Sequence, residues 1–498
     1  MKRKISLKQL AYWTLMLPGL ASVAPGCTVG PEFHAPPAPS TSGYTTGRVS
    51  AEPAEAPMTG GKLQRFEWGQ DLPGQWWILF GSPELNRLIQ EAIRSYPDIA
   101  AQQAALRASR EDVGAQFGQF FPQFQSNVLA ERERVSGATI GPGYPGFISN
   151  VFQATANLSY TFDLFGGQRR TLEGLRAQAE NERFKLQASY LTLMSNLVSS
   201  AIRVASLSDQ ITTTSDIIVL ESKQLDFIRQ RFEVGAQTRA DVLQQESNLA
   251  QVRATLPALE QQRNVEEHAL AVLTGRFPAD FEPLRLSLAD LTLPQDIPVS
   301  LPSSLVAQRP DIRAQESVLH AANAQVGVAT ANMLPQITLT GAIGRESLQW
   351  HTLFQPGSAL WNVAGGVTQP IFEGGALRAR RRAAIDRYEQ ANAQYRLTVL
   401  EAFQNVADSL TALEQDAKSV NAQSEALAAA ESSLDLIQRQ YDAGAVSYVA
   451  LLSAQQLYSQ ARLALVRDIA SRYIDTVSLF QSLGGGWWNR PQVVSSGP

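Results

Sequence analysis

The chain contains an internal duplication, and this feature constrains its fold more than any other. Four short motifs occur twice, in the same order and about 210 residues apart. The matched pairs are Tyr96-Pro97-Asp98-Ile99 with Arg309-Pro310-Asp311-Ile312, Phe121-Pro122-Gln123 with Leu334-Pro335-Gln336, Leu164-Phe165-Gly166-Gly167 with Phe372-Glu373-Gly374-Gly375, and Arg231-Phe232-Glu233-Val234-Gly235 with Gln440-Tyr441-Asp442-Ala443-Gly444. Self-similarity over such a length is typical of repeated architectures, so two copies of one structural unit are predicted.

A long helix is predicted in the middle of each copy, where mostly apolar residues recur every seven positions. The two series are Tyr190, Leu197, Val204, Ile211, Ile218, Leu225 and Phe232, and Ile385, Asn392, Val399, Val406, Leu413, Val420, Leu427, Leu434 and Tyr441. A sustained heptad indicates coiled-coil packing. A helix from about Gly167 to Phe232 would extend over ~100 Å. Taken alone, this pattern also fits a coiled-coil spacer or scaffold.

Each copy also contains two segments in which apolar and polar residues alternate. The clearest runs from Phe152 to Asp163, and the four expected strands are about 121–134, 151–163, 335–345 and 360–371. Alternation places an apolar face opposite a polar one, and ~9–11 residues suffice for a tilted strand to cross a bilayer. A half-buried soluble sheet would give the same pattern. Two such hairpins in an exported chain, with outer-face loops at 136–150 and 346–359, favour a membrane barrel with a polar interior.

Four strands are too few to enclose water, so we expect several subunits to share one barrel. The signs of export lie at the N-terminus. Residues 1–26 combine four basic residues with a short apolar run and contain no acidic residue, which is typical of a secretory signal.

The single cysteine, Cys27, follows Ala24-Pro25-Gly26 and is predicted to be a lipoprotein processing site that receives a lipid. A buried thiol is the alternative interpretation. Acyl chains contribute ~0.8 kcal/mol per buried methylene, so several chains on one residue would anchor the protein firmly. Residues 31–75 are rich in Pro, Ala, Gly, Ser and Thr and are expected to form an extended tether.

Composition argues against several other functions. Loss of the signal would change the net charge from −4 to −8, and no basic cluster dominates one face, so nucleic acid is not an expected partner. The four histidines lie far apart and have no metal-ligand spacing, and no Walker loop occurs. They are His34, His268, His320 and His351. We therefore expect no enzymatic activity, no metal and no cofactor.

Together these motifs resemble the TolC-like outer-membrane efflux factors, in particular their lipidated (OprM/NodT-like) branch. The resemblance covers essentially the whole mature chain. It is carried by Cys27-Thr28-Val29-Gly30-Pro31-Glu32-Phe33, the two Pro-Asp-Ile motifs, Phe372-Glu373-Gly374-Gly375 and Tyr441-Asp442-Ala443-Gly444. It implies a mixed α+β, mainly α fold, in which a homotrimer forms a twelve-stranded outer-membrane β-barrel continuous with a long periplasmic α-helical coiled-coil barrel.

The resemblance implies the function of an outer-membrane exit duct in a tripartite efflux system. Such a duct passes drugs or other toxic small molecules from an inner-membrane pump and a periplasmic adaptor to the outside. The protein would be anchored by lipid in the outer membrane, with its helical tunnel in the periplasm. Two alternatives remain, a periplasmic lipoprotein scaffold that binds coiled-coil partners without a pore and a duct for type I protein secretion. The cargo and the class of pump are not specified by the sequence.

Roles at the ends of the long helices are also implied by the resemblance. The tip turns, where an adaptor would dock, are expected at Gly235 and Gly444, because glycine accepts the positive φ of a tight reversal. Asp241 matches an acidic residue of the periplasmic gate, and Tyr441 matches an aromatic constriction residue. Alternatively, Asp241 only caps the helix that follows Gly235.

Three positions near the tips depart from the pattern of that family. Val446 stands where some relatives have an arginine that would pair with the gate acid, and Ala450 and Ser453 stand where relatives often carry aspartates. An acidic ring that selects cations is therefore not expected at this tip.

The expected domain organisation follows the duplication. It comprises a lipoprotein signal peptide (1–26), a lipid anchor with an extended tether (27–82), a first repeat (83–275), an equatorial segment (276–302), a second repeat (303–483) and a C-terminal tail (484–498).

Overall fold

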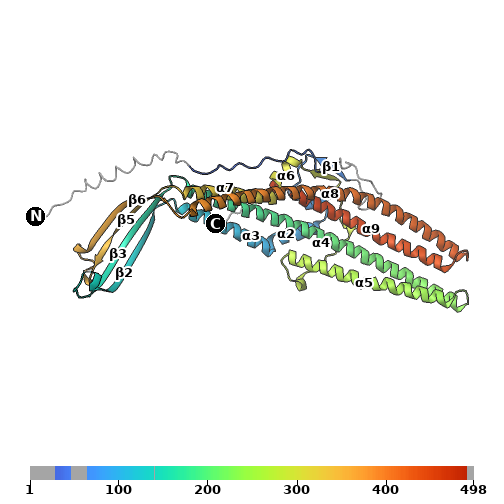
Figure 1. The fold of residues 1–498 in the computed structure, drawn as a ribbon. Coiled ribbons are helices and arrows are strands. Elements are labelled where there is room, and N and C mark those ends of the chain that lie inside the picture. The colour runs from blue at the N-terminus through green and yellow to red at the C-terminus, as the bar shows by residue number, and fades with distance from the viewer. Residues whose placement is uncertain (1–27, 46–63, 140, 491–498) are drawn as a thin grey trace. The chain divides into compact units, whose positions relative to one another are not determined.

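A computed structural model describes residues 28–45, 64–139 and 141–490 (Figure 1). The signal peptide and Cys27 lie outside the described residues, as do residues 46–63 of the expected tether and 491–498 of the expected tail. The chain divides into two compact units. The first comprises residues 107–180 and 316–393 together with the N-terminal segment up to residue 35, and the second comprises 36–106, 181–315 and the chain from residue 394 onward.

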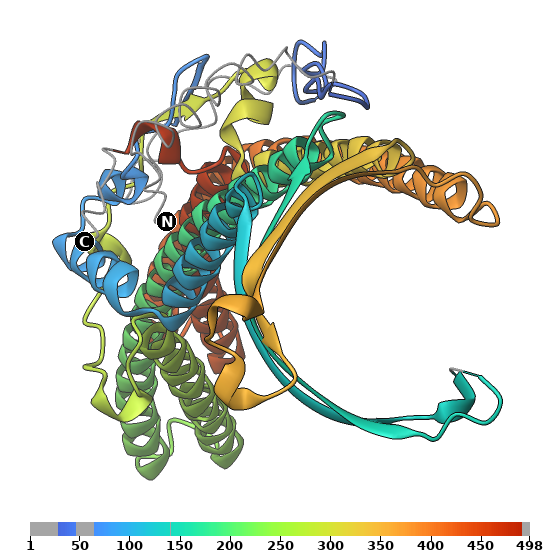
Figure 2. The same ribbon diagram turned by 90° about the vertical axis from the view of Figure 1, so that its left-hand side faces the viewer.

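The first unit is built around an antiparallel sheet of four strands, in the order β2-β3-β5-β6. Their bounds are β2 Gln123–Val135, β3 Phe147–Phe162, β5 Gln336–Ser347 and β6 Ala359–Thr368. All four alternating segments are therefore strands. β3 begins four residues before the expected boundary, because Phe147–Asn150 pair with the end of β2. The sheet curves strongly (Figure 2).

The helices that flank the strands and the tip turns form three pairs of equal length, with one member of each pair in each copy of the duplication. α3 Pro97–Gly118 and α7 Pro310–Ala331 have 22 residues each and lead into the strands. α4 Gly167–Glu233 and α8 Ala376–Asp442 have 67 residues each and follow the strands. α5 Arg239–Leu273 and α9 Tyr448–Ser482 have 35 residues each and return after the tip turns. These lengths confirm the two structural repeats and the long heptad helices.

The second unit contains most of the long helices and a small parallel sheet of β1 Arg65–Trp68 and β4 Asp296–Val299. Two shorter helices, α2 Pro83–Ser95 and α6 Pro302–Gln308, belong to the same unit. Its core is aromatic: the rings of Trp76 and Phe480 lie 5.6 Å apart, and those of Phe80 and Tyr473 lie 6.2 Å apart.

Two segments are more ordered than the sequence suggested. The end of the expected tether forms β1 and a 3-10 helix, Trp76–Phe80, because large apolar side chains there enter the core. The described start of the expected tail is also packed. Trp487 Nε1 donates to the carbonyl oxygen of Gln308 (2.6 Å), and Asn489 Nδ2 donates to that of Leu72 (2.9 Å).

Candidate functional site

The two faces of the four-stranded sheet differ sharply in polarity. The register aligns Phe124, Leu158, Gly341 and Val363 in one row across β2, β3, β5 and β6. The next row, on the opposite face, is Gln125, Asn157, Ala342 and Asn362. Because side chains alternate along each strand, every second row lies on the same face of the sheet. The sheet therefore has one mainly apolar face, interrupted by Ser126 and Arg345, and one mainly polar face.

The apolar face is unusually exposed for a single chain. Trp361, Val363 and Val128 are 77 %, 71 % and 73 % accessible. Contiguous exposed apolar surface on this scale marks a site of contact with lipid or another protein. Exposed aromatic residues also gather where the strands meet the helices, at Phe121 and Phe372. Aromatic residues in this position are typical of the interfacial girdles of membrane barrels.

The polar face carries hydroxyl and amide groups that bond along and across the strands. Gln153 Nε2 donates to Glu346 (3.2 Å), and the hydroxyls of Thr161 and Thr338 lie 3.4 Å apart. Such a surface is stable against water and unstable against hydrocarbon. The sheet also has two unpaired edges, β2 and β6, so one chain cannot close it. The geometry suits one section of the wall of a water-filled barrel.

The tip turns are where the glycines predicted them. Gly235 and Gly444 have φ of 74° and 73°, in the left-handed region, and each lies two residues beyond the last residue of a long helix, α4 or α8. At each turn two backbone bonds close the helix, Ala236 N to Arg231 O and Ala445 N to Gln440 O (2.8 Å each) among them. This is the Schellman arrangement, which needs glycine at the positive-φ position.

Asp241 acts as a helix cap in this structure. Thr238 is the N-cap of α5, and its hydroxyl accepts from Asp241 N (3.2 Å) while Asp241 Oδ2 accepts from Thr238 N (3.0 Å). The structure thus shows the helix-capping role that was given above as the alternative interpretation of Asp241. At the second tip the corresponding Ser447 makes no side-chain cap bond, and the third helical residue, Ala450, has no side-chain acceptor for the reciprocal bond.

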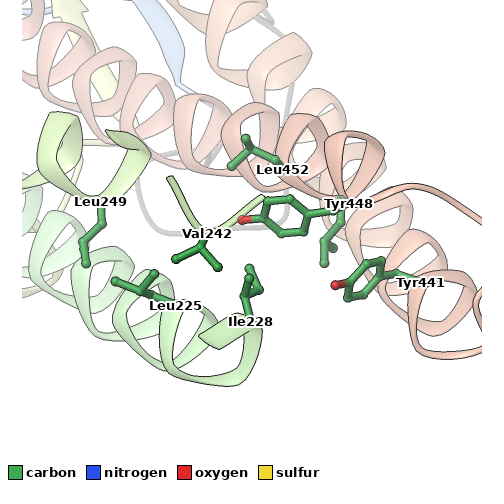
Figure 3. Packing of buried hydrophobic residues seen from close by; sticks show 8 residues of the cluster. Leu225, Ile228, Val242, Leu249, Tyr441, Tyr448 and Leu452 are labelled. Atoms are coloured by element: carbon green, nitrogen blue, oxygen red, sulfur yellow. The ribbon is translucent and has the colours of Figure 1, made fainter. Parts of the chain in front are cut away.

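Tyr441 is buried (3 % exposed) in an apolar cluster between the two hairpins, whereas Asp241 lies at the exposed start of α5. Figure 3 shows the ring of Tyr441 beside Tyr448, and Val242 and Leu225 of the first hairpin belong to the same cluster. Gln237 Nε2 donates to Tyr441 Oη (2.5 Å), which ties the loop after Gly235 to α8. Burial raises the pKa of Tyr441, so its phenol stays protonated at neutral pH.

A buried polar network close to these tips was missed by the sequence analysis. Glu221 of α4 is 4 % exposed and accepts from Gln245 Nε2 (2.5 Å) and from Asn248 Nδ2 (3.0 Å), both on α5. Within the described residues no ion pair neutralises this carboxylate. A carboxylate only accepts hydrogen bonds, so it holds both amides with their NH₂ groups toward α4.

The amide oxygens consequently face the second hairpin. Tyr448 Oη donates to Gln245 Oε1, and Gln456 Nε2 donates to Asn248 Oδ1 (3.0 Å). Burial also raises the pKa of Tyr448, which preserves this donor. One acid on α4 thus orients two hydrogen bonds between the hairpins. The sequence signal is faint: Gln245 and Asn248 stand three residues apart on an otherwise apolar face of α5.

A half-buried acidic group, Asp416, lies between α8 and α9, in the same unit. Burial, followed by a hydrogen bond to Asp475, raises the pKa of Asp416 to about 7. The folded protein therefore holds a proton that the unfolded chain releases above about pH 4. Stability should fall as the pH rises from about 4 to about 7, because ionised Asp416 is disfavoured only in the folded state.

We expect Asp416→Asn to remove this dependence. Thermal unfolding in detergent at pH 8 should occur at a higher temperature in the variant than in the parent, and the difference should shrink at pH 5 and vanish near pH 4. Glu414→Gln, two residues away in an exposed pair with Lys418, is the matched control and should leave both values unchanged. A parent melting temperature that is the same at pH 5 and pH 8 would contradict the assignment.

The described residues contain no cluster of three or more metal-ligating side chains and no helix that is long and apolar enough to cross a membrane.

Comparisons with known proteins agree with this geometry. The family described as outer membrane efflux protein matches residues 88–276 and 301–485, one match to each copy of the duplication. A pyoverdine export outer membrane protein, OpmQ of Pseudomonas putida, is 29 % identical over 437 residues, which are 87 % of this chain and 92 % of that protein. A probable outer membrane lipoprotein, SilC of Salmonella typhimurium, is 26 % identical over 93 % of this chain and 96 % of its own length.

The solved structure of the outer-membrane channel OprN is similar over 93 % of this chain and all of that chain. Its TM-score is 0.81, and its sequence is 26 % identical.

Proposed function

Because the chain belongs to the outer membrane efflux protein family, we propose that it is the exit duct of a tripartite efflux system for toxic small molecules. The protein is an outer membrane efflux component. The observation that carries the duct is the sheet, which has a mainly apolar face on one side, a mainly polar face on the other, and two unpaired edges. Lipid would cover the first face and water the second.

The assembly is a homotrimer in this proposal. Three copies of a four-stranded sheet give twelve strands, enough to enclose an aqueous lumen. The helices that continue from the strands would form the periplasmic tunnel. Repeats at 83–275 and 303–483, with the segment 276–302 at the equator, describe each protomer. Lipidation at Cys27 would add an anchor in outer-membrane lipid, and a lipoprotein among the relatives supports it.

An inner-membrane pump and a periplasmic adaptor complete the proposed machine, with the adaptor docking at the tip turns of Gly235 and Gly444. The relatives are named for export of pyoverdine and for toluene efflux, so small organic molecules are the substrate class to test first. The periplasmic scaffold and the protein-secretion duct are weaker candidates, since the scaffold gives no role to the exposed apolar face of the sheet.

Conductance in planar bilayers tests the duct directly. Purified trimers should give discrete, small and long-lived openings, and cells lacking the gene should become sensitive to toluene or antibiotics. Labelling of the 136–146 loop on intact cells is the complementary measurement. An unlabelled loop together with silent, correctly inserted protein would favour the scaffold.

The gate in this proposal includes Asp241 and Tyr441. Replacing both by alanine should raise conductance severalfold, because the variant loses the carboxylate half of the α5 capping box and the Gln237–Tyr441 bond between hairpins. Arg239→Ala, on the same turn as Asp241, is the control. Conductance equal to that of the parent in the double variant would remove both residues from the gate.

A further inference from the structure

The two edge strands of the sheet are connected to different helices. α3 leads into β2 at one edge, and α8 follows β6 at the other. In the proposed homotrimer, the edge strand β6 of one protomer pairs with β2 of the next. α8 of one protomer therefore lies beside α3 of the next, just below the barrel. The inference that follows rests on this proposed assembly.

The corresponding contact inside one protomer is visible, and it serves as a template. α4 and α7 pack against each other, and residues equally far from the strands meet. A Cβ added at Gly167, the first residue of α4, would lie 3.2 Å from Ala331 Cβ, the last residue of α7. A Cβ at Gly174 would lie 3.6 Å from Ala324 Cβ, and each residue is seven positions from its end of its helix.

The duplication transfers this template to α8 and α3. α8 has the length of α4, and α3 has the length of α7, so positions can be matched by counting from the strands. Ala324 of α7 corresponds to Glu111 of α3, and Ala177 of α4 corresponds to Asp386 of α8. Both alanines are buried within the protomer, whereas Glu111 and Asp386 are exposed.

These two carboxylates would be enclosed by the next protomer, which is costly for an unpaired charge. A basic residue stands at the matching depth on each opposite helix. Arg382 is six residues from the start of α8, and Glu111 is seven from the end of α3. Asp386 is ten residues from the start of α8, and Arg107 is eleven from the end of α3.

We propose that the seam between protomers below the barrel is closed by two ion pairs in opposite orientation, Glu111 with Arg382 of the next protomer and Arg107 with its Asp386. The four side chains are exposed, and none forms an ion pair with any residue in the described part of its own chain. Small residues at Ala379 and Ala383 leave room on α8 for the neighbouring helix.

The placement of cations on α8 supports a partner outside the protomer. Its first turns carry four exposed arginines and no acid in the first turn. They are Arg378, Arg380, Arg381 and Arg382. Positive charge at a helix N-terminus opposes the helix dipole. Acidic groups of a neighbouring helix would offset that cost. Arg107 and Asp386 would form a second pair of opposite charges, four residues farther from the strands on each helix.

Charge reversal and rescue test the seam. Glu111→Arg and Arg382→Glu should each lower the temperature at which the trimer dissociates on SDS gels and reduce the trimer fraction. The double variant should restore both values, because the pair is re-formed with its charges exchanged. Each seam occurs three times in a closed ring, so single variants act threefold. Arg107→Glu with Asp386→Arg repeats the test at the second pair.

Arg378→Glu is the matched control, with the same charge change on the same helix. Its counterpart Arg169 pairs with Asp163 of its own copy (3.2 Å), so no loss of trimer is expected. Single variants with parental dissociation temperatures, or a double variant without rescue, would overturn the seam while leaving the homotrimer standing. Parent protein that forms no trimer at all would instead overturn the proposed assembly.

Discussion

Val363→Arg should abolish stable insertion of the barrel, whereas Asn362→Arg, one residue earlier, should leave insertion intact. Val363 is the fifth residue of the ten-residue strand β6, near the middle of the apolar face. An arginine on the lipid-facing side of a barrel costs ~2–4 kcal/mol at the bilayer midplane. Three copies in a trimer would raise this to roughly 6–12 kcal/mol, comparable to the whole stability of an ordinary domain.

Asn362 has the same strand position but the opposite orientation. Its row on the polar face includes Gln125 and Asn157, so an arginine there would remain in water. The measurement is the fraction of heat-modifiable, membrane-inserted trimer for both variants at equal expression. The Asn362 variant should also change conductance, since its side chain would stand in the lumen. Equal loss of insertion in both variants would mean that the two faces are not lipid and water.

Much of this architecture could be predicted from the sequence because its signals are periodic. Alternation over β3 specified both the strand and its lipid-facing side, and the cross-strand register extends that side to all four strands. The heptads ending at Phe232 and Tyr441 predicted helices whose observed ends differ by a single residue. The glycine turns followed from the single residue type that accepts the required φ.

Contacts between distant segments were not predictable in the same way. Composition suggested a tether up to residue 82, yet Trp76 and Phe80 pack against α9. All five residues from 76 to 80 are large and apolar, and burial of three of them outweighs the flexible composition of the segment as a whole. The network of Glu221 joins three helices through side chains that look ordinary one by one. Asp241 could be named from the sequence, but its bonds to Thr238 appear only with the turn in place.

The two tips also differ in what stabilises them. The first uses a charged cap, Asp241 with Thr238, and the second has neither this acid nor a side-chain cap at Ser447. Val446, the residue before Ser447, packs against the apolar cluster and offers no polar group to the first hairpin. The neutral bonds made by Tyr448 and Gln456 are therefore the main polar link from α9 to the first hairpin near the tip.

Glu221→Leu should open this link and raise conductance more than any other single change. The variant loses two hydrogen bonds to a charged acceptor, each worth ~1.5–3 kcal/mol, and leaves the amides of Gln245 and Asn248 buried without their partner. Released amides can rotate, so Tyr448 and Gln456 lose aligned acceptors. If opening separates the hairpins, the equilibrium constant between the closed and the open tip should shift toward the open tip by roughly 10²-fold or more.

Two further variants make this result specific. Tyr448→Phe removes one neutral bond and should shift the same equilibrium by only about fivefold, at ~1 kcal/mol. Glu246→Ala is the matched control, because this acid also bridges α4 and α5, through Arg229 (2.8 Å), but makes no bond to α9. Single-channel conductance and open probability rank the three. We expect the largest increase in open probability for the Glu221 variant, a smaller one for the Tyr448 variant and the smallest for the Glu246 variant. A Glu246 variant that is as open as the Glu221 variant would show that loosening one hairpin is sufficient and that the bonds to α9 do not hold the tip.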